Sequence, residues 1–203
     1  MLSVMFGATF IVHAQELVKD KSIPIFNEVP KPHDGMAYDY AVNFKGDKYN
    51  FYVSNILLLD YYASFNYVMD NDNQTRGEVL MSEGAYANAT DLYNYFSGGR
   101  ATLDKQTSVW LSQKLFKEIK EKGKVVMSTD KSSPKTYKVV KVKKDADKYY
   151  KVHVNGEYRN IPCIQIVSED GSQKLWITDN PENPIILKMD IGFSIELFSV
   201  STD

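Results

Sequence analysis

Residues 149–167, YYKVHVNGEYRNIPCIQIV, carry the strongest fold signal in the chain. The dipeptide Asn155-Gly156 lies between two strand-like segments, 149–154 and 157–161. Both central residues of such a two-residue turn need positive φ, which Asn and Gly tolerate best. This segment therefore predicts a tight antiparallel β-hairpin.

Similar strand-like runs recur on both sides of the hairpin. They are rich in aromatic and β-branched residues and are bounded by Gly, Asn, Asp or Pro, as β-strands are. The other predicted strands cover 36–44, 49–58, 61–69, 78–81, 124–128, 136–143, 161–167, 174–178, 185–189 and 193–200. Because most connections are short, neighbouring strands should be antiparallel, since a parallel pair needs a long crossover.

Two short helices are expected to interrupt the strands. In the first, from Asn88 to Gly98, apolar side chains recur at helical spacing; they are Ala89, Leu92, Tyr93 and Phe96. In the second, from Ser112 to Gly123, the apolar face consists of Leu111, Leu115, Phe116 and Ile119. Ser and Asn suit the N-cap, and Gly suits the end of a helix. Residues 101–110 fit either a strand or a helical lead-in.

These elements together predict the fold class. We expect an α+β fold with a curved, mostly antiparallel, half-barrel-like sheet and two short helices.

The N-terminal residues 1–14, MLSVMFGATFIVHA, predict a signal peptide. The uncharged apolar run is shorter than the roughly 20 residues that cross a bilayer, and it fits the apolar region of an export signal. No Lys or Arg precedes it, and a buried N-terminal strand is the alternative. We expect the mature chain to begin at Gln15, with an extended lead-in over 15–35 and a single β-rich domain over 36–203. The protein should be exported to the periplasm or cell surface, with no membrane span.

The charge pattern gives no reason to expect a nucleic-acid partner. The formal net charge is −2, and it provides no general attraction to polyanions. The lysine-rich stretch 131–151 is interrupted by Asp145 and Asp147 and alternates with apolar residues, which is typical of a solvated strand face. Cys163 is the only cysteine, so it forms no internal disulfide, and we expect it to be buried as a small apolar residue.

The sequence contains no recognisable catalytic or metal-binding pattern, and we expect no enzyme activity and no cofactor. After cleavage only His33 and His153 remain, and neither has a second ligand at metal-site spacing. A Cys163–His153 dyad matches no known pattern. Residues 70–74, DNDNQ, resemble the start of a calcium loop but lack its Gly and Glu. We interpret them as a polar hairpin tip, with a weak surface calcium site as the alternative.

Aromatic and methionine side chains are the remaining functional signal, because the chain has 14 Tyr, 10 Phe and 2 Trp. Some of them are candidates to line a ligand cavity inside the curved sheet. The alternative for most of them is ordinary core. The candidates are Phe65, Tyr67, Met69, Trp110, Trp176, Met189 and Phe193.

Two segments resemble a known group of proteins. Residues 175–193, LWITDNPENPIILKMDIGF, and residues 107–112, TSVWLS, with the helix that follows, are similar to uncharacterised exported envelope proteins of Gram-negative bacteria. The strand pattern also resembles the periplasmic half-barrels that carry lipids or lipoproteins. The resemblance implies an exported β-rich fold and supplies no catalytic residues.

Two functional hypotheses follow. In the first, the protein is non-catalytic and its curved sheet binds a lipid, an acyl chain or another apolar molecule, with Trp110 at the cavity entrance. In the second, it is an envelope interaction module that binds a protein or a glycan through exposed aromatic residues. A continuous apolar cavity favours the first, and a filled core with exposed aromatic residues favours the second.

Overall fold

The computed structural model describes residues 35–59, 62–141 and 148–202. Its strands are β1 (Met36–Phe44), β2 (Asp47–Leu59), β3 (Tyr62–Met69), β4 (Arg76–Ser82), β5 (Asp91–Leu92), β6 (Gly99–Leu103), β7 (Gln106–Thr107), β8 (Lys124–Thr129), β9 (Lys135–Val139), β10 (Tyr149–Val154), β11 (Glu157–Ser168), β12 (Lys174–Thr178), β13 (Ile186–Asp190) and β14 (Ser194–Thr202). Its helices are α1 (Glu83–Asn88) and α2 (Gln113–Lys122).

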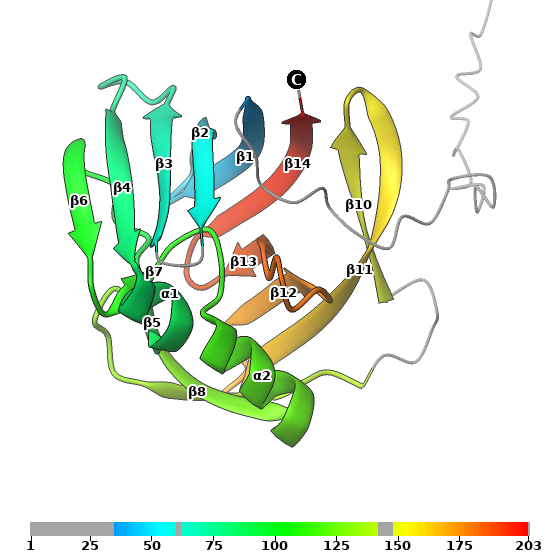
Figure 1. The fold of residues 1–203 in the computed structure, drawn as a ribbon. Coiled ribbons are helices and arrows are strands. Elements are labelled where there is room, and N and C mark those ends of the chain that lie inside the picture. The colour runs from blue at the N-terminus through cyan, green and yellow to red at the C-terminus, as the bar shows by residue number, and fades with distance from the viewer. Residues whose placement is uncertain (1–34, 60–61, 142–147, 203) are drawn as a thin grey trace, which may run out of the picture.

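The strands form one strongly curved and mostly antiparallel sheet, as the sequence predicts. Five of them, β10 to β14, close into a small barrel, because β10 pairs with β11 on one side and in parallel with β14 on the other. From β14 the sheet continues through β1, β2, β3 and β4 to β6, and from β11 it continues through β9 and β8 to β5 and β7. Figure 1 shows β6, β4, β3 and β2 side by side, with α1 and α2 near the lower strands.

The central hairpin forms as predicted. Asn155 and Gly156 have φ of 51° and 82°, and Val154 pairs directly with Glu157 across the turn. The predicted bounds of β1, β10 and β12 match the structure, and most other predicted strands differ at their ends by a few residues. The predicted strand 136–143 ends at Val139, and its last two residues lie outside the described part of the chain.

The prediction of a helix over 88–98 is wrong. Helix α1 ends at Asn88, where that helix was expected to begin, and its N-cap is Ser82. The apolar residues that suggested a helical face serve two different cores: Leu92 packs in one, whereas Tyr93 and Phe96 pack against the other. The backbone here joins the sheet instead, through β5, and the Tyr93 N–H donates to the carbonyl of Thr107. Residues 101–110, which the sequence left open, contain β6 and β7 rather than a helical lead-in.

The second helix matches its prediction. The Ser112 hydroxyl accepts a hydrogen bond from the Leu115 N–H and donates one to the Ala89 carbonyl, which ties the start of α2 to the end of α1. Gly123 ends the helix in the left-handed conformation. Leu115, Phe116 and Ile119 are buried, so one face of the helix packs against the rest of the domain.

The apolar interior consists of two clusters. The first contains buried side chains of β1 to β4 together with Trp110 and residues of β10, β13 and β14. The second lies around the buried face of α2 and contains residues of β8, β11, β12 and β13. Both clusters draw on the barrel strands, so the barrel joins them.

Candidate functional site

The residues predicted to line one ligand cavity do not surround a common space. Phe65, Tyr67, Met69 and Trp110 are buried in the first cluster, and Met189 is buried in the second. Trp176 and Phe193 are half-buried. Of these residues, Met69 and Phe193 line one pocket formed by the described part of the chain, and this pocket is presented below.

Trp110 is an interior residue. Its side chain is 0 % exposed, its indole N–H donates to Oδ1 of Asn183 over 2.9 Å, and its ring contacts those of Tyr38 and Phe65. The expectation that it stands at a cavity entrance is therefore wrong. A buried indole N–H needs an acceptor, and the Asn183 side chain provides it.

Tyr67 likewise has a structural role. Its hydroxyl accepts the N–H of Gly98 over 3.0 Å. A Cβ atom on Gly77 would lie 2.7 Å from this hydroxyl and 2.1 Å from the Gly99 carbonyl oxygen. Gly77 therefore permits the close approach of β4, β6 and the tyrosine.

Several turns that are distant in the sequence enclose a pocket of about 620 Å³. We call it the loop pocket. It lies between the β1–β2 turn, the β3–β4 turn, residues 94–96, Asp130 after β8, and Phe193 before β14. Its apolar wall consists of Phe44, Tyr49, Met69, Tyr95, Phe96 and Phe193.

Two aromatic residues of this wall reach solvent. Tyr95 is 72 % exposed and Phe44 is 41 % exposed. The Phe44 ring meets the Phe193 ring edge-on at 5.9 Å, and the ammonium of Lys45 lies 5.1 Å from the Phe44 ring centre. Exposed aromatic rings beside a pocket are characteristic of binding surfaces.

Four carboxylates complete the wall. Asp70 accepts hydrogen bonds from the backbone and side-chain amides of Asn50, and Asp130 accepts one from the Asn94 N–H over 2.6 Å. Partial burial raises the pKa of Asp130 above its usual value. Asp47 and Asp72 are exposed, and among the described residues no hydrogen bond or ion pair of either carboxylate is seen. The only basic residue that lines the pocket is Lys48.

A much smaller cavity of about 20 Å³ adjoins the loop pocket and shares Asn94 and Phe96 with it. A space of that size holds about one water molecule. The Nδ2 atom of Asn94 is inaccessible to solvent and has no hydrogen-bond partner among the described residues. Val109, which also lines this cavity, has φ of 68°. That conformation is strained for a β-branched residue and costs about 1–3 kcal/mol.

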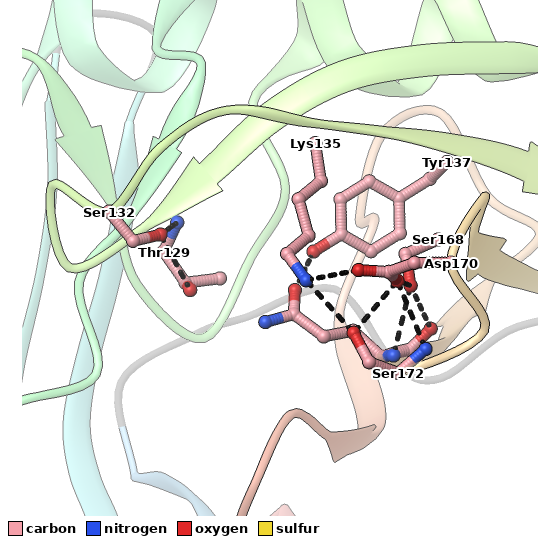
Figure 2. Close-up of polar contacts among 8 residues, drawn as sticks. Thr129, Ser132, Lys135, Tyr137, Ser168, Asp170 and Ser172 are labelled. Carbon is pink, nitrogen blue, oxygen red and sulfur yellow. Dashed lines mark hydrogen bonds and ion pairs between the residues drawn. The ribbon is translucent and has the colours of Figure 1, made fainter.

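A polar cluster at the β11–β12 turn is a second candidate (Figure 2). Asp170 accepts hydrogen bonds from Lys135 at 2.6 Å, Ser168 at 2.6 Å and Ser172 at 2.8 Å. The hydrogen bonds from Lys135, Ser168 and Ser172 hold the pKa of Asp170 well below its usual range. Lys135 is an ion-pair donor to Asp170, and both serine hydroxyls donate to the same carboxylate. We interpret the cluster as a set of hydrogen bonds that stabilises the exposed β11–β12 turn.

Tyr137, on the adjacent strand β9, contributes to the same hydrogen-bonded turn. Its hydroxyl donates to the Gln173 side chain, and burial raises its pKa to about 12. Thr129 and Ser132 form a separate turn contact and lie apart from this cluster in Figure 2. None of these residues lines the loop pocket.

A surface hollow of about 1020 Å³ lies over α2. Charged side chains of that helix form much of its wall, and Lys120 there pairs with Asp179 over 2.6 Å. Charged residues on the outer face of a helix are solvated. This hollow lacks the aromatic wall of the loop pocket, and we do not select it as a ligand site.

The remaining sequence candidates are also placed. His153 pairs with Tyr158 across the hairpin, and its ring lies 3.7 Å from that of Tyr158. Cys163 is five residues further along β11, about 16 Å at the strand rise, so the two cannot form a dyad. His33 lies outside the described residues.

Residues 70–74 form a hairpin tip between β3 and β4, where Asn71 Oδ1 accepts the Thr75 N–H. In the described ranges, no three His, Cys, Asp or Glu side chains are grouped as a metal site. Within the same ranges, neither helix has the length and apolarity that crossing a membrane requires.

Comparison of the chain with protein-family models, curated proteins and solved structures found no match. The resemblance to exported envelope proteins therefore stays a prediction.

Proposed function

We propose that this chain is a non-catalytic binding protein that takes up its ligand at the loop pocket. One observation carries the proposal: exposed aromatic rings, buried apolar side chains and polar groups from distant turns meet around about 620 Å³ of open space. Ligand sites typically have volumes of about 300–1,000 Å³ and combine apolar walls with a few polar groups.

The geometry supports an interaction module better than a lipid carrier. A buried acyl chain needs a continuous apolar cavity of several hundred Å³. The cavity beside the loop pocket measures only about 20 Å³. Of the predicted cavity residues, Phe65 and Trp110 pack against each other, and Tyr67 packs against the rings of Phe51 and Phe96. The exposed rings of Phe44 and Tyr95 are available to a partner molecule.

We test this proposal with an amide-resolved NMR titration of small amphipathic probes, namely indole, phenol and choline. Shift changes should concentrate in the turns that form the loop pocket. Tyr95→Ala should weaken binding at least about twofold, because a stacked aromatic contact contributes about 0.5–1.5 kcal/mol. Tyr158→Ala is the matched control, since Tyr158 is 49 % exposed on another hairpin.

The opposite outcome is equally concrete. If native mass spectrometry of the protein from its own host shows a co-purified lipid, and a fluorescent fatty acid shifts residues inside the sheet instead, the lipid-carrier hypothesis is correct.

Export belongs to the same proposal and concerns residues outside the described ranges. Sequencing of the native N-terminus should find Gln15, and retention of Met1 would contradict it.

A further inference from the structure

We infer that the loop pocket selects a ligand that carries a positive charge on an apolar group, such as an alkylated ammonium. This inference rests on the proposed function and adds the chemical class of the ligand. Its basis is the combination of aromatic faces and unneutralised carboxylates around one pocket.

The charges of the lining residues are unbalanced. Four aspartates and one lysine line the pocket, and with Lys45 at its rim the formal charge around it is −2. The whole chain carries −2, so the negative charge is concentrated here. A pocket lined by charges of one sign attracts a ligand of the opposite sign.

The carboxylates are held in place without being neutralised. Asp70 is bound by the neutral amides of Asn50, and Asp130 is bound by the neutral backbone N–H of Asn94. Asp47 and Asp72 have no ion-pair partner among the described residues. By contrast, Asp170 and Asp179 elsewhere on the surface each pair with a lysine.

The aromatic wall adds the second element of cation recognition. An ammonium within about 6 Å of an aromatic ring centre is attracted to the ring face. The chain itself shows this at the rim, where the Lys45 ammonium lies 5.1 Å from the centre of the Phe44 ring. Tyr95, at 72 % exposure, offers a second ring. An anion would meet both the ring faces and the carboxylates unfavourably.

The test uses three probes of nearly the same shape and different charge, titrated against the full chain by NMR. They are choline, which is cationic, 3,3-dimethylbutan-1-ol, which is neutral, and 3,3-dimethylbutyrate, which is anionic. We expect choline to bind at the loop pocket at least about fivefold more tightly than the neutral alcohol, and the anion to bind most weakly. Raising the salt concentration should weaken choline alone.

The double variant Asp47→Asn/Asp72→Asn should weaken choline about fivefold and leave the neutral alcohol unchanged, since each exposed charge pair contributes little by itself. Both residues are exposed, so the fold should be retained, with an unchanged thermal midpoint as the check. Asp104→Asn, an exposed carboxylate that does not line the pocket, is the matched control.

The outcomes separate the two proposals. Equal binding of choline and the alcohol at the loop pocket, or preference for the anion, overturns the charge selection and leaves the binding site standing. The absence of shifts at the loop pocket with all three probes overturns both proposals.

Discussion

At the scale of single residues, burial decides the chemistry of the one thiol. Cys163 is half-buried on β11 and packs against the first apolar cluster. Burial, together with the nearby charge of Asp179, raises its pKa to about 11. Only the thiolate is nucleophilic, so this cysteine should be unreactive in the folded protein. The sequence prediction of a buried residue is met in part.

Labelling of Cys163 with a thiol reagent such as DTNB should therefore be slow. With a pKa of about 11, roughly one thiol in a thousand is ionised at pH 8, against about a quarter for an ordinary cysteine. Native labelling at pH 8 should be about a hundredfold slower than in urea, and the native rate should rise steeply between pH 9 and 11. Equal rates in the native and unfolded protein would show that the thiol is not protected.

At the scale of elements, backbone conformation determines the central hairpin. Asn155 and Gly156 both adopt positive φ, and the β10–β11 register runs unbroken from Val154–Glu157 to Tyr149–Pro162. A one-residue shift of register would move every side chain to the opposite face of the strand. The turn therefore sets which residues of β10 and β11 enter the core.

Gly156→Val should destabilise the protein by on the order of 1 kcal/mol or more, because a β-branched residue strongly disfavours positive φ. A Cβ atom at position 156 meets no neighbour within 4 Å. The loss of stability should therefore come from the backbone conformation and not from a steric clash. Gly84→Ala is the opposite control: Gly84 lies in α1, where an added Cβ would make only an ordinary contact of 4.0 Å with the Ser82 hydroxyl oxygen, and alanine there should stabilise the helix by about 0.5–1 kcal/mol. Urea denaturation measures both, and an unchanged midpoint for Gly156→Val would contradict the prediction.

At the scale of the whole molecule, the barrel strands connect the two apolar clusters. Strand β13 contributes Leu187 to the first cluster and Ile186 to the second, and β11 contributes Ile161 and Ile166 in the same way. Neither cluster can lose its packing without disturbing strands that the other one needs. The protein should therefore unfold as one cooperative unit.

Phe116→Ala tests this cooperativity. Phe116 is buried on α2 in the second cluster, and its truncation should cost about 3–5 kcal/mol. Both tryptophans contact the first cluster, so the loss should appear with the same midpoint in tryptophan fluorescence and in circular dichroism. Lys114→Ala on the exposed face of the helix should change the midpoint little. If Phe116→Ala left the midpoint of the fluorescence transition unchanged, the two clusters would unfold as independent units.

The sequence predicts the parts of the fold that depend on local contacts. Strands such as β1 and β12 follow from the alternation of side chains along a short segment. Helix α2 follows from the apolar spacing of Leu115, Phe116 and Ile119 between a serine cap and a glycine stop. The Asn155-Gly156 turn follows from the φ preferences of two adjacent residues.

Local spacing fails where neighbouring residues belong to different cores. Leu92 and Phe96 have helical spacing, but they pack in separate clusters, and pairing of β5 with β7 and β8 takes the backbone into the sheet. The loop pocket is also formed by segments that are distant in the sequence. The sequence selects Met69 and Phe193, but it misses Phe44, Tyr49, Tyr95 and Phe96. The only local signal is that several of these residues flank a polar or glycine-containing turn.

The sequence by itself therefore determined most of the longer strands, the capped helix and the central turn, because their causes act between residues a few positions apart. Tertiary structure alone decided the closure of the barrel, in which His153 of β10 lies beside Ser199 of β14. It also decided the loop pocket, whose walls come from turns between residues 44 and 193. These features depend on which distant segments pack together, and the free energy of that packing belongs to the whole arrangement of strands rather than to any one segment.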